Sequence, residues 1–432
     1  MLYLLSSLFF LIFDRRKYSL STYLFFLLFL SALCSFFVGR QHFWDYDSII
    51  YVLYIDIFLC LLLLGYRRFS SLRGYDFSSV NQRRLRQLEK TLINLGNLVL
   101  VIDVFILYKI FTMLTSELFT VQEFKNEGGA EDVFASIVPH PLMTFGRLFS
   151  PLGYLYISFH FYYLILDKKR RAFKYLILSM VLVLNGIITL SRSATVEYLL
   201  VYTGILFFVM PLLRKSIRRS IIKYSFLFGM IILSLLFVVS SSRFSDFYSK
   251  KSKNVAILDE SQNPLFFSTI DYFSLWQEQS IEYLQKRKPG QIYYGMYNSF
   301  GLGEMILKRI YGNKVINEKR EKEIFNKLGD ISYSFHGPIA RLVYDFGYIG
   351  SVLFVLIYFC VLNHFSPQKG VLRFRELLFI PLLLPLGVLF FVGNALGSLS
   401  LDIAIIYGIV IYIITKHNKK NNEKVVANKC NC

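Results

Sequence analysis

Apolar stretches of near-spanning length alternate with short polar segments along most of the chain. A helix needs about 20 consecutive apolar residues to cross the hydrocarbon core of a membrane. The pattern predicts eleven spans, at approximately residues 1–13, 18–38, 49–65, 91–114, 148–166, 172–190, 194–213, 223–240, 347–363, 376–394 and 398–415. We therefore expect an all-α, polytopic integral membrane protein.

One long polar segment, residues 241–346, interrupts the series of spans. Within it, residues 265–287 carry apolar side chains at helical spacing, and residues 317–330 show a second helical pattern. This segment is long enough to form a small, partly helical unit outside the membrane. The expected organisation is a bundle of about eight spans at 1–240, a large outside loop at 241–346, about three spans at 347–415 and a basic tail at 416–432.

The distribution of charge predicts how the spans are oriented across the membrane. The net charge is +19 and 55% of the residues are hydrophobic. The loops that would share one side carry 28 Lys and Arg residues, against 4 in the short loops of the other side. Lys and Arg concentrate in cytoplasmic loops, so we expect the N-terminus outside, the C-terminus in the cytoplasm and no nucleic-acid partner.

Motifs for nucleotides and metals are absent from the sequence. It has no GxGxxG after a strand, no GxxxxGK[ST] and no HExxH. Its histidines show no metal-ligand spacing, and its five cysteines suggest no disulfide framework. We expect neither a metal nor a cofactor.

Three arginines are predicted at the outer edge of the membrane: Arg147, Arg192 and Arg243. Each has the ordinary interpretation of a side chain that reaches from a helix end to water. Together they form a candidate ring of cations at the depth of a lipid phosphate, which a guanidinium binds in a bidentate manner. Glu197 follows Arg192 inside the next span, so it must face protein or water.

A second candidate lies at "SFHGPIARLVYDFGYIG", residues 334–350, which we name the elbow. Proline is favoured at the first position of a helix, so Pro338 predicts a helix start there. Arg341 and Asp345 are one turn apart and able to pair. His336 precedes the helix and is a candidate base for a sugar hydroxyl. The alternative interpretation is a simple turn of the chain into the membrane with a capping pair.

These segments resemble a known family. The tight hairpin "LSRSATVEYLL" looks like the "SGSR"-type segment of the Wzy O-antigen polymerases and related repeat-unit polymerases, and "FHGPIARLVYDFGYIGSVLFVLIY" is similar to the "HN-x-L…GxxG" segment of polymerases and O-antigen ligases. Many spans with one dominant outside loop match the layout of that family. Gly337 stands where the family has asparagine after the histidine.

The resemblance implies a metal-independent glycosyltransferase in the bacterial cytoplasmic (inner) membrane. It would polymerise undecaprenyl-pyrophosphate-linked oligosaccharide units into O-antigen or capsular polysaccharide. His336, Arg341 and Arg192 would be catalytic, and Arg147, Arg243, Glu197 and Asp345 would bind the pyrophosphate or glycan. The expected partners are the lipid-linked glycan, membrane lipid and a chain-length regulator protein. An O-antigen ligase and a repeat-unit flippase are the alternatives.

Overall fold

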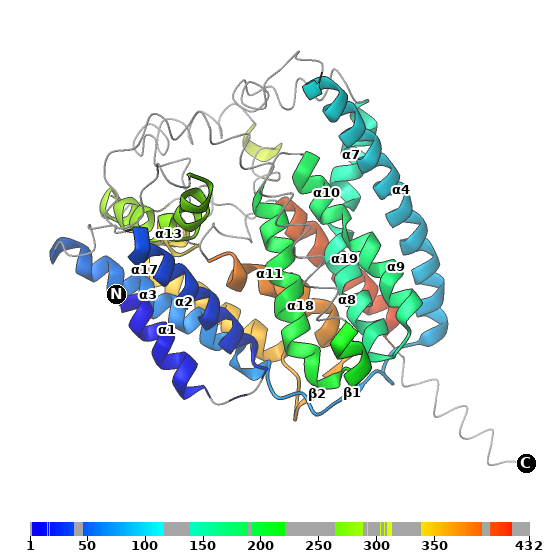
Figure 1. Ribbon diagram of the computed structural model, residues 1–432, viewed down its shortest axis with the longest axis horizontal. Helices are drawn as coiled ribbons and strands as arrows, with labels where there is room; N and C mark the ends of the chain where they lie inside the picture. The colour runs from blue at the N-terminus through cyan, green and yellow to red at the C-terminus, as the bar shows by residue number, and fades with distance from the viewer. Residues whose placement is uncertain are drawn as a thin grey trace, which may run out of the picture.

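Helices form where the apolar stretches predict them in the computed structural model (Figure 1). The structure describes residues 2–14, 16, 18–38, 46–115, 139–188, 192–220, 264–287, 292, 303, 306, 309–312, 338–390 and 398–416. The span predicted at 223–240 and the helix predicted at 317–330 lie outside these residues.

The N-terminal part of the bundle is almost entirely helical. Its helices are α1 (Leu2–Phe13), α2 (Leu20–Val38), α3 (Tyr46–Leu64), α4 (Gln82–Thr115), α7 (His140–Phe149), α8 (Leu152–Ile165), α9 (Lys169–Ser179), α10 (Val181–Ile188) and α11 (Arg192–Val209). Two 3₁₀ turns, η2 (Gly65–Arg68) and η3 (Met210–Leu212), follow α3 and α11.

The C-terminal part adds α13, α17, α18 and α19. Their bounds are Pro264–Gln285, Pro338–Phe365, Phe374–Val388 and Leu399–Thr415. Strands β1 (Gly74–Asp76) and β2 (Val371–Arg373) complete the described elements.

Six helical segments in the described residues are long and apolar enough to cross a membrane. They lie in α2, α3, α4, α9 with α10, α11, and α17, whereas α1 and α19 are shorter apolar helices. The chain is therefore a helical protein with several candidate membrane-spanning helices. The total of eleven spans stays a prediction.

The loops predicted to share one side do meet on one face, which we name the basic face (Figure 1, bottom). Strand β1 pairs in parallel with β2, with Gly74 opposite Val371, although the two strands belong to loops far apart in the sequence. Val80 forms an antiparallel bridge with Lys416 at the end of α19. The Leu20 amide donates to the Phe69 carbonyl over 2.9 Å, which brings in the first loop as well.

Side chains tie the remaining basic loops to this face. Arg214 forms an ion pair with Asp167, and an Arg218 Nη donates to the Tyr18 hydroxyl over 2.6 Å. Helix α4 starts nine residues before the predicted span. The Asn81 side chain accepts hydrogen bonds from the amides of Arg83 and Arg84, as an N-cap residue does.

Helix α13 confirms the helical pattern predicted at 265–287 and lies against the bundle. Its Trp276 is fully buried: Nε1 donates to Ser31 Oγ of α2 over 2.8 Å. The indole ring also contacts the rings of Tyr3 and Phe390. The core of the bundle therefore extends into the segment that the sequence predicts as an outside loop.

Helix α17 starts at Pro338, as predicted, and bends at Gly347. Gly347 has φ 71° and ψ 177°, a conformation that only glycine adopts readily. The bend separates a short helix, 338–346, from the apolar helix 348–365 that continues to the basic face. The elbow thus lies at the end of α17 opposite the basic face (Figure 1).

Candidate anion-binding site at the elbow

The short helix of the elbow has one buried face, and its sequence explains why. Ile339, Leu342 and Val343 are at most 2% exposed, in agreement with the apolar face expected from their spacing. Arg341 lies between these positions on the helix and is only half-buried. Burial of the apolar face therefore fixes the position of the arginine.

Arg341 lacks a partner in the part of the chain that the structure describes. Its Nε atom is buried and has no hydrogen-bond acceptor there. No ion pair joins it to Asp345, so the pair allowed by their spacing does not form. Asp345 is itself 1% exposed and makes an interaction of its own. A buried donor without an acceptor is costly, which makes Arg341 a candidate for binding a ligand.

A second cation, Arg287, comes to the elbow from the end of α13. Its guanidinium lies 5.3 Å from the centre of the Tyr348 ring, just after the bend. An Nη of Arg287 lies 3.8 Å from the position that a Cβ atom on residue 347 would occupy, so the guanidinium is close to the bend. Sequence reasoning missed Arg287, although its place at the end of the helical pattern 265–287 was the available signal.

Tyrosines hold the two helices and α3 together around these cations. The Tyr344 hydroxyl donates to the Tyr283 carbonyl over 2.9 Å, and the two rings lie 4.2 Å apart. Tyr54 of α3 donates to the Tyr348 carbonyl over 3.0 Å and contacts Ser351 Oγ at 2.5 Å. These contacts place Arg287 and the bend on a support built from three helices.

Two polar side chains further along α13 each have one buried atom without a partner among the described residues. Gln277 is 2% exposed, and its Nε2 atom has no acceptor in the described residues. The Oε1 atom of Gln279 is also buried and without a donor there. We define the elbow site as Arg341, Arg287 and Tyr348. Guanidinium groups suit an oxyanion such as a phosphate.

The other predicted site residues are not brought to the elbow by any described contact. His336 and Arg243 lie outside the described residues, as does the side chain of Arg192, which begins α11. Arg147 is exposed in the last turn of α7. The ring of outer arginines therefore stays a prediction.

Glu197 faces protein, as expected for a carboxyl group within a span. Its Oε1 accepts a hydrogen bond of 2.5 Å from the hydroxyl of Tyr154, which belongs to α8. The carboxyl group is therefore satisfied in part by a neighbouring helix.

Metal and disulfide chemistry find no site among the described residues. No group of three His, Cys, Asp or Glu side chains there has the arrangement to hold a metal ion. The thiols of Cys34, Cys60 and Cys360 are all free.

Comparison with known proteins does not add to this geometry. No protein family model, no curated protein and no solved structure matches the chain.

Proposed function

We propose that the protein polymerises undecaprenyl-pyrophosphate-linked oligosaccharide units on the outer face of the bacterial cytoplasmic membrane. The observation that carries this proposal is Arg341, half-buried with an unpartnered Nε at the end of α17 opposite the basic face. Lys and Arg gather on the cytoplasmic side of membrane proteins, so the elbow belongs outside. The eleven spans, with the N-terminus outside and the C-terminus inside, are part of the same proposal.

The reaction is a substitution at the first sugar of the growing glycan. The hydroxyl oxygen of the acceptor unit bonds to the anomeric carbon, and the bond from that carbon to the pyrophosphate oxygen breaks. The pyrophosphate leaves with the electron pair, so negative charge develops where Arg341 and Arg287 would bind it. The hydroxyl proton passes to a base, the role that the resemblance gives to His336.

The remaining residues have supporting roles in this proposal. Arg192, with Arg147 and Arg243, would bind lipid pyrophosphate at the bilayer edge. Glu197 would hold the outer end of α11 against α8 through Tyr154. Asp345, buried within the elbow, would support Arg341 by fixing the short helix rather than by touching the glycan.

The test is the glycan ladder of cells that carry Arg341→Ala or Arg341→Lys in place of the wild-type gene. We expect both variants to lose long-chain glycan, because lysine lacks the planar fork that binds phosphate oxygens. Arg86→Ala removes the same charge from an exposed position of α4 and should leave the ladder unchanged. Immunoblots of the membrane fraction show whether each variant is present at the wild-type level.

The pattern of the ladder separates the alternatives. A single capped repeat unit in the Arg341→Ala strain supports a polymerase. Complete loss of capping indicates a ligase, and lipid-linked units trapped in the inner leaflet indicate a flippase. A wild-type ladder from Arg341→Ala would refute the role of the elbow site.

A further inference from the structure

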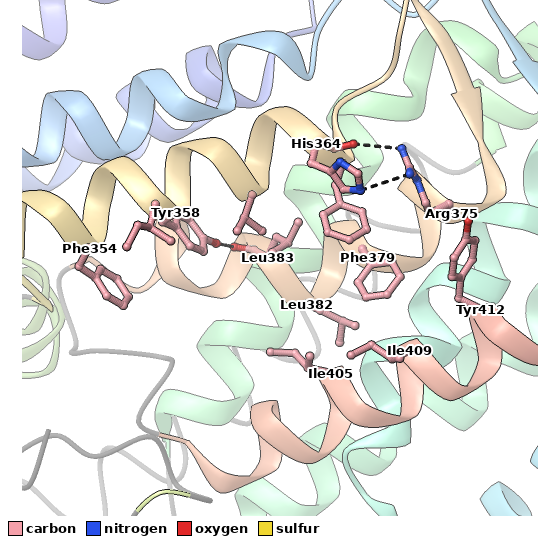
Figure 2. A pocket seen from close by; sticks show the side chains of 13 residues that line it. Phe354, Tyr358, His364, Arg375, Phe379, Leu382, Leu383, Ile405, Ile409 and Tyr412 are labelled. Carbon is pink, nitrogen blue, oxygen red and sulfur yellow. Dashed lines mark hydrogen bonds between the residues drawn. The ribbon is translucent and has the colours of Figure 1, made fainter.

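A groove runs between α17, α18 and α19, separate from the elbow site. Its volume is about 500 Å³. Helix α18 packs against both α17 and α19 and forms the floor of the groove with Phe379, Leu382 and Leu383. Figure 2 shows the side chains that project into it from the three helices.

The walls of the groove are apolar and open toward the surroundings. Ile357 of α17 is 66% exposed and Ile409 of α19 is 44% exposed, and both line the groove. Helix α17 is one of the candidate membrane spans. An apolar groove beside such a span opens into lipid, so its natural contents are hydrocarbon chains.

One end of the groove is cationic. An Nη of Arg375 donates to the His364 carbonyl over 3.0 Å, and another lies 3.4 Å from His364 Nε2 (Figure 2). The guanidinium also lies 5.5 Å from the Phe365 ring. Tyr412 lines the same end, and Lys416 Nζ lies 5.9 Å from its ring.

The nearby carboxylate does not cancel this charge. Glu376 is fully buried and accepts a hydrogen bond of 2.6 Å from the Arg373 amide. Its other oxygen is 3.9 Å from an Nη of Arg375, whose side chain keeps 21% exposure. Arg375 and Lys416 outnumber the single carboxylate of Glu376 and leave a net positive end, and this end belongs to the basic face.

We propose that the groove binds an anionic phospholipid from the leaflet at the basic face. Its acyl chains would lie along Ile357, Leu382 and Ile409, and its phosphate would contact Arg375 and Lys416. This polarity opposes that of the lipid pyrophosphate substrate, whose charged group would lie at the other face, so the inference does not depend on the proposed function. The bound lipid would join α17 to α19 over the floor of α18.

The test is native mass spectrometry of the full-length protein, delipidated in detergent and titrated with phosphatidylglycerol. Arg375→Ala should weaken binding about tenfold, the loss expected for one charge-assisted contact to phosphate. Arg86→Ala removes an equal charge elsewhere on the basic face and should bind as the wild type does. Phosphatidylcholine, which has no net charge, should bind less tightly to the wild type and be insensitive to Arg375→Ala.

A second pair of variants tests the groove itself. Ile409→Trp places an indole in the groove and should abolish phosphatidylglycerol binding. Ile413→Trp, one turn further along α19 and 64% exposed, does not line the groove and should bind normally. Unchanged binding in both Arg375→Ala and Ile409→Trp would overturn the proposal. So would equal affinity for phosphatidylcholine, or displacement of phosphatidylglycerol by undecaprenyl phosphate.

Discussion

The basic face and the elbow differ in how far the side chains of their arginines are satisfied by protein partners. At the basic face, three of the described arginines have protein partners: Arg214 pairs with Asp167, Arg218 donates to Tyr18, and Arg16 donates to the Arg67 carbonyl over 3.1 Å. At the elbow, Arg341 is half-buried and has none among the described residues. What distinguishes Arg341 from these three arginines is a buried donor without an acceptor among the described residues, which is the reason for proposing a site there.

The same contrast separates two ways of joining helices. The basic face is joined by backbone hydrogen bonds between loops, above all the β1–β2 pair. The elbow is joined to α13 by large buried side chains, namely Tyr283 and Tyr344, and α13 is joined to the rest of the bundle by Trp276. Removal of single side chains should therefore damage the elbow far more than the basic face.

The largest expected effect on stability follows Trp276→Ala. The loss of a fully buried indole with its hydrogen bond to Ser31 should lower the free energy of unfolding by about 3–5 kcal/mol. Thermal denaturation of the purified protein in detergent should show a clearly lower midpoint. Phe173→Ala removes an aromatic ring that is 62% exposed and should have little effect. Equal midpoints for these two variants would mean that α13 does not stabilise the bundle.

A smaller effect is expected for Gly347→Ala. A side chain at φ 71° and ψ 177° strains the backbone by about 1–3 kcal/mol and would tilt the short helix that carries Arg341. Denaturation midpoint and glycan length should both fall. Gly74→Ala is the matched control, because a side chain there meets no atom within 4 Å and the backbone needs no positive φ. If Gly74→Ala lowered the denaturation midpoint as much as Gly347→Ala, backbone strain at the bend would not explain the loss of stability.

The smallest effect is expected for Arg214→Ala on the basic face. The Arg214 side chain is 74% exposed, so its ion pair with Asp167 should contribute about 0–1 kcal/mol. Both the denaturation midpoint and the glycan ladder should resemble the wild type. A loss of long-chain glycan in this variant would remove the functional distinction between the two faces.

Hydropathy and charge predicted the parts of the fold that depend on composition. Apolar length located the described candidate spanning helices, and the preference of proline for the first helical position located the start of α17 at Pro338. The grouping of Lys and Arg predicted which loops meet, and the β1–β2 pair brings two of those loops together. These features follow from short stretches of sequence, each read independently of the others.

Features that depend on distant segments were not predictable in this way. The polar side chains of α13, such as Gln277, made the helix look like part of an outside loop, whereas the structure buries it through Trp276. The bend at Gly347 and the approach of Arg287 depend on how α13 packs against α17. For the candidate site, the sequence singled out Arg341 but not Arg287, because nothing in the local spacing links residue 287 to the bend at Gly347.

The β1–β2 pair has a consequence for how the chain is made. Domains fold from the N-terminus during synthesis, and Gly74 must wait for Val371 before its strand can pair. Four of the six candidate spans in the described residues are translated in that interval, so the loop after α3 leaves the ribosome early and without its partner. Formation of the β1–β2 pair is thus a late event in biogenesis. A nascent chain that ends before β2 would lack the backbone hydrogen bonds that join these two loops at the basic face.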